Sequence, residues 1–383
     1  MTDSWDADNK AADSRSESVP LVVDLDGTLL RTDLLFESAL RLIKQKPWLA
    51  PLMPLWTLKG RAYLKRRIFQ QIRLDVSLLP LNEELLPWLR DEKLRGRRIV
   101  LATASDYEQA RSVVEPLRLF DAVLGSDGKL NLKGRRKLKT IVELCGKEFD
   151  YVGNSSSDLA ILRGCRRGVL VNASRRVERS ARRSGNVLRV FPPPAIALRD
   201  TLSALRWDQW FHNSLLFLPA IVSHRIFDAA VAGNTALAFL AFGFCASGVY
   251  ILNDLLNLEE DRRNRTKQHG LFASGRMSIG TGILLASACL SASAVIAAFV
   301  PYAFLTALIV YAVLTSLYSL YLNRFLAVGA LTLALLYTLR VVAGHLATGI
   351  PFSFPLLFLG FFLFLSFVLI QKTLWPRIAR TTQ

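Results

Sequence analysis

Residues 19–28 read Val-Pro-Leu-Val-Val-Asp-Leu-Asp-Gly-Thr, in which a short apolar run leads directly into two carboxylates, Asp24 and Asp26. An apolar run rich in β-branched residues is typical of a buried strand. Side chains two residues apart in an extended segment point to the same side, and Gly27 permits a tight turn directly after them. Because open α/β sheets bind ligands at the carboxyl ends of their strands, this stretch predicts an α/β fold with a ligand site around Asp24.

Four more short apolar runs of this kind follow, separated by stretches in which apolar residues recur with helical spacing. That alternation favours a parallel sheet wound by helices. The insertion at about residues 33–93 has helical periodicity and no comparable run, so we interpret it as a small helical cap. The α/β domain is expected to span residues 19–198. Its later strands are expected at 97–105, 121–125, 149–154 and 168–172.

The pattern DLDGT at residues 24–28 resembles the first motif of the haloacid dehalogenase-like (HAD) hydrolases. Other elements of that family occur in the same order. Thr103 ends the strand run IVLAT, Lys137 lies within LKGRRK, and GNSSSD at 153–158 follows FDYV. The resemblance implies a Rossmann-like HAD domain that hydrolyses phosphate esters.

The family resemblance also implies a role for each matched residue. Asp24 would attack phosphorus to form an aspartyl phosphate, and Asp26 would protonate the leaving oxygen and then activate water. Thr103 and Lys137 would hold the transferring phosphoryl group. Magnesium is the implied cofactor, because it is a hard cation suited to oxygen ligands. Its implied ligands are Asp24, the main-chain carbonyl of Asp26, Asp158 and Asn154, the last in a place that is usually acidic.

Two basic stretches of this domain leave alternatives open. Lys137 lies among six basic residues from Lys129 to Lys139, a run that also fits a solvated helix face or a site for anionic lipid headgroups. The stretch LKGRAYLKRRIFQQI at 58–72 is amphipathic. It fits a cap helix with a solvated basic face, a helix lying on a membrane, or a part of the cap that selects substrate.

From residue 213 onward the chain becomes a series of apolar runs, each close to the ~20 residues that a hydrocarbon core requires. Lys and Arg gather before the first run and after the even-numbered ones, which predicts a cytoplasmic α/β domain and cytoplasmic termini. We therefore expect a multi-pass protein of the inner or plasma membrane of a prokaryote, with phospholipid as a partner. The expected elements are a disordered tail at 1–18, a linker helix at 199–212, and six spans within 213–383 at 214–231, 234–253, 279–300, 302–322, 326–348 and 351–371.

Ionisable residues at the end of the second expected span mark a functional site. Residues 253–262 read NDLLNLEEDR. If the helix continues, Asp254 and Asp261 share one face and could hold Mg²⁺ against a diphosphate. With YTLRVVAG around residue 340, the pattern resembles the phosphoribosyltransferase-type branch of the UbiA prenyltransferase superfamily. The implied substrate-binding residues are Asn253, Asp254, Asp261, Arg262, Lys267 and Arg340.

The second resemblance implies polyprenyl phosphate or prenyl diphosphate, together with phosphoribosyl diphosphate, as substrates. A phosphatase on the same membrane face could then remove the 5-phosphate of a lipid-linked product. Some positions depart from the family pattern. Asn257 and Gly329 stand where acidic residues are expected, and no Asp or Glu follows Asp261. The family has nine spans and six are expected here, which makes the helical domain look short at its C-terminal end.

Three functions therefore stay open from the sequence. The first is prenyl-type or phosphoribosyl transfer coupled to phosphate-ester hydrolysis. The second is a membrane-anchored, magnesium-dependent phosphatase with an inactive or truncated UbiA-like bundle, and the third is a non-enzymatic scaffold. The net charge of +17 fits membrane apposition and phosphate-bearing substrates. No base-stacking or helix-turn-helix pattern accompanies that charge, so nucleic acid is not an expected partner.

Overall fold

The computed structural model describes residues 19–381, with side chains through Ile370. The tail expected at 1–18 lies outside the described residues. The chain divides into two compact units. One, here called the sheet unit, contains the residues up to Ile196 together with Leu258–Ile279. The other, the helical unit, contains Ala197–Asn257 and the residues from Gly280 onward.

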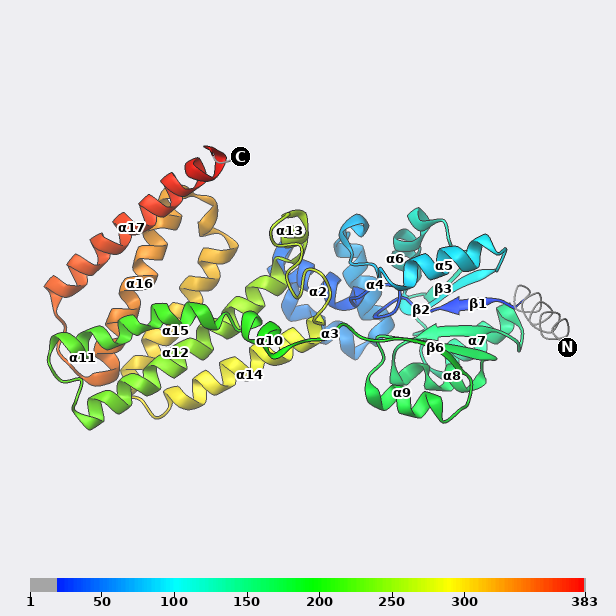
Figure 1. The fold of residues 1–383 in the computed structure, drawn as a ribbon, viewed down its shortest axis with the longest axis horizontal. Coiled ribbons are helices and arrows are strands. Elements are labelled where there is room, and N and C mark those ends of the chain that lie inside the picture. Colours follow the sequence, from blue (N-terminus) through cyan, green and yellow to red (C-terminus); the bar gives the residue numbers. More distant parts are fainter. Residues whose placement is uncertain (1–18, 382–383) are drawn as a thin grey trace, which may run out of the picture. The chain divides into compact units, whose positions relative to one another are not determined.

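The sheet unit is built on six parallel strands in the order β3-β2-β1-β4-β5-β6 (Figure 1). The central strand β1 lies between β2 and β4, and its register pairs Val22 with Val100 and with Tyr151. Five of these strands match the expected runs, whereas β6 was missed. The strands are β1 (Leu21–Val23), β2 (Ile99–Asp106), β3 (Ala122–Ser126), β4 (Asp150–Gly153), β5 (Arg167–Val171) and β6 (Val187–Phe191).

Helices cover both faces of this sheet (Figure 1). Successive strand residues point to opposite faces. Leu21 and Val23 accordingly pack in one core with Leu85, and Val22 packs in another with Ile141. The result is a three-layer α/β/α sandwich. Its covering helices are α5 (Leu85–Leu94), α6 (Tyr107–Val114), α7 (Arg135–Cys145), α8 (Leu159–Gly164) and α9 (Arg175–Arg182).

The expected cap is helical. A separate small apolar core holds it together, which includes Leu42, Trp56 and Ile68. Asp33 caps the first helix by accepting hydrogen bonds from the amides of Leu35 and Phe36. The cap consists of α2 (Leu34–Gln45), α3 (Met53–Leu58), α4 (Arg61–Gln71) and 3₁₀ turns at Pro47–Leu52 and Val76–Leu78.

The helical unit contains four helices that are long and apolar enough to cross a membrane among the described residues. These are α12 (Ala229–Leu256), α14 (Ile279–Ala297), α15 (Tyr302–Leu320) and α16 (Leu326–Thr348). A shorter apolar stretch, Phe354–Ile370, opens α17 (Phe354–Thr381). The expected linker region holds α10 (Leu198–Ala204) and the start of a 3₁₀ helix at Trp207–Phe217.

The first expected span, 214–231, is wrong as a continuous helix. The 3₁₀ helix ends at Phe217, α11 covers only Leu218–Val222, and α12 begins at Ala229. Between them the chain turns through His224, whose φ is +56°. The apolar residues on either side made the segment look like one span, but the polar turn divides it.

A second break falls at the end of α12. Asn257 follows Leu256 with φ −105° and ψ 15°, and a new helix, α13 (Leu258–Arg263), starts directly after it. The continuous helix on which the shared face of Asp254 and Asp261 depended is therefore absent. Asp254 belongs to the helical unit, and Asp261 belongs to the sheet unit.

Candidate functional site

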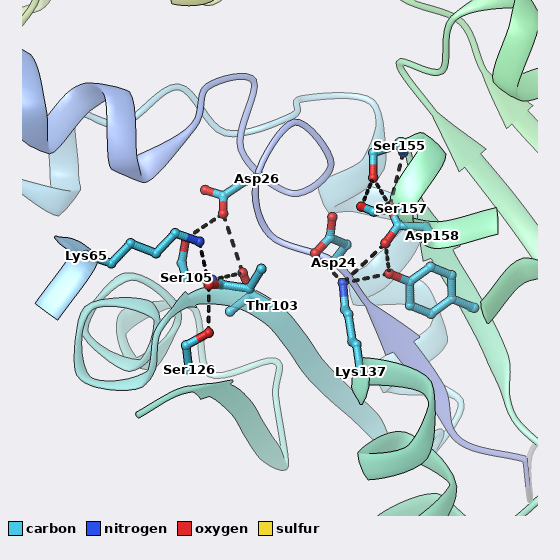
Figure 2. Close-up of polar contacts among 12 residues, drawn as sticks. Asp24, Asp26, Lys65, Thr103, Ser105, Ser126, Lys137, Ser155, Ser157 and Asp158 are labelled. Atoms are coloured by element: carbon cyan, nitrogen blue, oxygen red, sulfur yellow. Dashed lines mark hydrogen bonds and ion pairs between the residues drawn. The ribbon is translucent and has the colours of Figure 1, made fainter. Parts of the chain in front are cut away.

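The predicted carboxylates gather at the carboxyl end of the central strand, where the chain order changes from one side of β1 to the other. Asp24 directly follows β1 and is buried. Its Oδ1 accepts a hydrogen bond of 2.6 Å from Lys137 Nζ on α7 (Figure 2). Lys137 Nζ also lies 3.6 Å from Asp158 Oδ1. One buried ammonium thus stands between two carboxylates that are 134 positions apart in the sequence.

The surroundings of Asp158 hold it in a fixed orientation. Its Oδ1 accepts from the Tyr151 hydroxyl at 2.9 Å, and its Oδ2 accepts from the amide and the hydroxyl of Ser155 at 3.1 and 2.7 Å. Gly153 leaves the space that this packing needs. A Cβ there would lie 2.5 Å from the Tyr151 ring and 3.2 Å from Asp158 Oδ2. The glycine of the GNSSSD pattern is thereby explained by close packing.

Burial sets the ionisation of these groups. Burial raises the pKa of Asp24 to about 7, with the Asp158 carboxylate adding to the rise and Lys137 opposing it. Burial also acts against the charge on Asp158, but Lys137 and the Ser155 hydrogen bonds lower its pKa overall. For Lys137 the two carboxylates outweigh burial and raise the pKa. The two carboxylates therefore keep Lys137 charged. The single ammonium does not fully offset burial and the Asp158 charge at Asp24, so the pKa of Asp24 stays raised.

Asp26 occupies a separate part of the same edge. Its Oδ2 accepts a 2.5 Å hydrogen bond from Ser105 Oγ (Figure 2). Its Oδ1 accepts a 2.9 Å bond from the amide of Leu34. The hydroxyl of Thr103 lies 3.5 Å from Asp26 Oδ2 and accepts from the amide of Ser105. Both carboxylate oxygens of Asp26 are thus oriented by neighbours on the two sides of the site.

Asn154, the departure from the acidic pattern, is next to the turn. Its side-chain nitrogen would lie 2.1 Å from a Cβ at position 27, so Gly27, with φ +73°, makes room for it. Its Oδ1 is buried and has no hydrogen-bond partner. A buried amide oxygen without a partner, beside the turn that follows Asp24 and Asp26, is the kind of ligand that a hard cation uses. The described residues contain no group of three His, Cys, Asp or Glu side chains with metal-site spacing, so the amide and main-chain oxygens would have to complete the set.

Residues that the sequence did not single out also line this edge. Ser105 and Tyr151 both bond directly to predicted site residues. Lys65 extends from cap helix α4 to donate a 2.6 Å hydrogen bond to the carbonyl of Ala104, and Figure 2 shows it reaching toward Asp26. Burial lowers the pKa of Lys65, and the charges of Asp26 and Asp33 oppose that change. The basic stretch at 58–72 therefore presents at least one cation to the site.

The membrane motif is divided in the structure. In the helical unit, Asp254 Oδ1 accepts a 2.6 Å bond from Arg206, and Asn253 is buried in α12. In the sheet unit, Asp261 lies 3.4 Å from Lys267. Arg262 donates to both carboxylate oxygens of Glu37 and to the carbonyl of Ala273. The chain's own groups contact each of these predicted substrate-binding charges.

Arg340, the remaining predicted residue, lies buried in α16. It donates to Asn213 Oδ1 at 3.0 Å, to the Tyr311 hydroxyl at 3.1 Å and to the carbonyl of Leu336. The side-chain nitrogen of Asn213, Nδ2, is buried without a hydrogen-bond partner. A charge held inside apolar helices is costly and is usually retained for function.

Known proteins resemble both halves of the chain. Residues 215–376 match the UbiA prenyltransferase family. The uncharacterized protein y4nM of Sinorhizobium fredii is 34% identical over 362 residues, covering 94% of this chain and 70% of that protein. A decaprenyl-phosphate phosphoribosyltransferase of Corynebacterium glutamicum is 31% identical over 103 residues, covering 26% of this chain and 31% of that enzyme.

Among solved structures, a HAD family hydrolase from Salmonella enterica aligns with 42% of this chain and 65% of its own, at 13% identity and a TM-score of 0.33. The sequence relatives extend through the helical half, where the family match lies. The chain therefore belongs to the UbiA prenyltransferase family.

Proposed function

We propose that the sheet unit hydrolyses a phosphate monoester at Asp24. The observation that carries this proposal is the buried contact of Lys137 with Asp24 and Asp158 at the carboxyl end of the central strand. A carboxylate nucleophile beside a fixed cation is suited to phosphoryl transfer, in which catalysis consists mainly of positioning and charge stabilisation.

The proposed reaction has two steps. A carboxylate oxygen of Asp24 bonds to phosphorus while the bond from phosphorus to the ester oxygen breaks, and Asp26 gives its proton to the departing alkoxide. Water then attacks the phosphorus of the aspartyl phosphate while Asp26 accepts a proton from that water. The bond between phosphorus and the Asp24 oxygen breaks, which releases inorganic phosphate and restores the Asp24 carboxylate. The Lys137 ammonium and the Thr103 hydroxyl offset the charge on the phosphoryl oxygens. Ser105 and the Leu34 amide keep Asp26 aimed at the leaving oxygen.

Magnesium is the proposed cofactor. Asp24, Asp158, Asn154 and the main-chain carbonyl of Asp26 would hold it, and the buried, unpartnered Oδ1 of Asn154 supports that assignment. When bound, the ion would supply positive charge to the phosphoryl oxygens and would keep the Asp24 carboxylate ionised. This matters because burial and the neighbouring carboxylates, opposed by Lys137, raise the pKa of Asp24 to about 7.

For the helical unit we propose prenyl-type transfer in which polyprenyl phosphate accepts 5-phosphoribose from phosphoribosyl diphosphate. Similarity to decaprenyl-phosphate phosphoribosyltransferases supports this substrate class. The sheet unit would then remove the 5-phosphate from the lipid-linked product. The proposed setting is the inner membrane of a prokaryote, with the sheet unit and both termini in the cytoplasm, because Lys and Arg gather on the corresponding loops.

An observation also favours a second candidate, a membrane-anchored phosphatase with an inactive bundle. Asp254 is paired with Arg206 within the helical unit, and Arg262 is paired with Glu37 within the sheet unit. Charges that already have partners must exchange them before they can hold a diphosphate. In this alternative the helical unit serves to keep the phosphatase near lipid-linked substrates.

The two candidates release different products. Transfer from phosphoribosyl diphosphate releases diphosphate, and hydrolysis of the 5-phosphate releases inorganic phosphate. The full chain in detergent, given polyprenyl phosphate, phosphoribosyl diphosphate and Mg²⁺, should yield lipid-linked ribose and both anions. Asp24→Asn should yield lipid-linked 5-phosphoribose and diphosphate only.

Two results would overturn parts of this account. Phosphate release from supplied polyprenyl-phosphoryl 5-phosphoribose, without any transfer to polyprenyl phosphate, would reject the transferase in favour of the anchored phosphatase. Unchanged phosphate release in Asp24→Asn would reject the site itself.

A further inference from the structure

The segment between α12 and α14 forms part of the sheet unit, although the family pattern assigns it to the membrane half. Within Leu258–Ile279 the apolar side chains of Leu258, Phe272 and Met277 are buried. Gly275, with φ +70°, lies so close to the chain after the Asp26 turn that a Cβ there would be 2.7 Å from Arg31 Cβ and 3.1 Å from the Arg31 carbonyl oxygen. The segment is thus packed tightly beside the strand-to-cap connection.

A buried ion pair joins this segment to the cap. Arg262 Nη1 donates to Glu37 Oε2 at 3.1 Å, and Nη2 donates to Oε1 at 2.6 Å. Arg262 Nε donates to the Ala273 carbonyl at 2.9 Å. The two side chains are only 7% and 5% exposed. Such a bidentate ion pair fixes both the orientation and the distance of the two side chains. Removing either side chain would leave the other as an uncompensated buried charge.

Glu37 leads from this pair back to the candidate site. It lies in the first turn of α2, and its Oε1 also accepts a 2.7 Å hydrogen bond from the Thr32 hydroxyl. The carbonyl of Thr32 in turn accepts a 3.1 Å bond from the amide of Gly27, which directly follows Asp26. At the start of α2, the amide of Leu34 donates to Asp26 Oδ1. Two short series of contacts therefore connect Arg262 to Asp26. Both begin at Glu37: one passes through Thr32 to the Gly27 amide, and the other passes through the first turn of α2 to the Leu34 amide.

Neighbouring pairs reinforce the segment without burying charge to the same degree. Arg263 contacts Asp75 at 3.1 Å and Glu259 at 2.8 Å, and its side chain is 59% exposed. Exposed pairs contribute little to fixing a structure. Arg263 is next to Arg262 on the same short helix and carries the same charge, which makes it a matched control.

We propose that Arg262 is a positioning residue of the phosphatase site. It holds Glu37, and through Glu37 it fixes the Thr32–Leu34 connection that orients the Asp26 carboxylate. A residue of the membrane family motif would then serve the hydrolytic reaction instead of binding a diphosphate. The kinetic part of this inference rests on the proposed phosphatase function, whereas the structural part does not.

The test compares Arg262→Met with Arg263→Met in the full chain in detergent. Hydrogen exchange should become at least about tenfold faster at the amides of residues 26–36 in Arg262→Met and stay as in the unsubstituted chain in Arg263→Met. With p-nitrophenyl phosphate, kcat should fall about 10- to 100-fold in Arg262→Met, with KM changed less than about threefold, because misplaced groups lose transition-state contacts. Arg262→Lys, which keeps the charge with fewer donors, should recover part of kcat and is the variant to use if Arg262→Met does not fold.

Each alternative result has a definite meaning. Unchanged exchange at residues 26–36 together with unchanged kcat in Arg262→Met would overturn the inference. Loss of lipid transfer with normal exchange and normal kcat would also overturn it, by making Arg262 a substrate residue. Absence of phosphatase activity from the unsubstituted chain would reject the proposed function, and the exchange comparison would still decide whether Arg262 fixes the Asp26 turn.

Discussion

The ammonium of Lys137 lies 2.6 Å from Asp24 Oδ1 and 3.6 Å from Asp158 Oδ1, and all three side chains are buried. Helix α7 supplies the cation, while the two carboxylates follow neighbouring strands of the sheet. The contact unites three residues that the sequence pattern predicted separately. It also shows that Lys137 is the residue of the basic run 129–139 that contacts both carboxylates.

Removing that ammonium should abolish most of the hydrolytic activity. We expect Lys137→Met to lower kcat for a phosphate monoester by about 100- to 1,000-fold, the range seen when one charge-stabilising donor is lost. Lys139→Met is the matched control on the same helix, because Lys139 is 82% exposed and only approaches Glu143 at 3.8 Å. Steady-state phosphate release measures both. Equal activity in the two variants would exclude a role for Lys137.

Magnesium dependence should respond to the residue at position 154. Chelation should abolish phosphate release and added Mg²⁺ should restore it. Asn154→Asp places a carboxylate where the buried Oδ1 has no partner, so the half-saturating Mg²⁺ concentration should fall about tenfold, which corresponds to about 1.4 kcal/mol. Asn154→Ala should raise it. A Mg²⁺ titration that is the same in all three proteins would remove Asn154 from the proposed ligands.

Lys65 should select substrates by the charge of their leaving group. Its ammonium extends from the cap to the Ala104 carbonyl near Asp26, on the proposed side of the leaving oxygen. We expect Lys65→Met to raise KM about tenfold more for phosphate monoesters that carry a second anionic group than for neutral ones, since a hydrogen bond to a charged group is worth about 1.5–3 kcal/mol. Lys59→Met, outside α4, is the control. An equal change in KM for both substrate types would contradict this role.

Acid sensitivity of the sheet unit should depend on Asp150. Burial opposes its charge, but hydrogen bonds from Arg166 and the charge of Arg97 lower its pKa overall. Since the folded pKa is below the unfolded value of about 3.9, the resulting stability is fully present above that value and is lost as pH falls through the lower folded pKa. Asp150→Asn should therefore unfold more easily at neutral pH, by about 1.5–3 kcal/mol, because it weakens charged hydrogen bonds to Arg166 and Arg97. Buried Arg97 then keeps only one carboxylate partner, Glu92.

The same variant should show a weaker fall in stability below about pH 4. Hydrogen exchange of the β1 and β4 amides at several pH values measures this in the full chain. Glu143→Gln removes an exposed carboxylate from a loose pair and should change stability by less than about 0.5 kcal/mol. A steeper loss of protection in Asp150→Asn at low pH would contradict the sign of the effect.

Short-range patterns predicted the sheet and the two carboxylates well. The alternation of apolar strand runs with helices, and the position of Asp24 and Asp26 after the first run, depend on local spacing that the sequence displays directly. The strand β6 was missed because only part of it is buried: Leu188 and Arg189 are exposed at the sheet edge. Its sequence therefore lacks the continuous apolar run of a central strand.

Contacts between residues far apart in the chain could not be predicted from local sequence patterns. The sequence placed Lys137 and Lys139 in one basic run, and only the orientation of α7 separates the buried residue from the exposed one. Arg262 followed a family pattern, yet its partner Glu37 lies 225 positions away in the cap. The first expected span failed for a different reason, because a polar turn at His224 breaks an otherwise apolar stretch.

The most direct test of the central claim is to trap the acyl phosphate. The full chain is mixed with a phosphate monoester and Mg²⁺ and quenched during turnover. Borohydride then reduces any acyl phosphate to the alcohol, and peptide mass spectrometry locates the reduced residue. The account predicts reduction at Asp24, with none at Asp26 or Asp158 and none in Asp24→Asn. Reduction at another carboxylate, or steady phosphate release by Asp24→Asn, would contradict it.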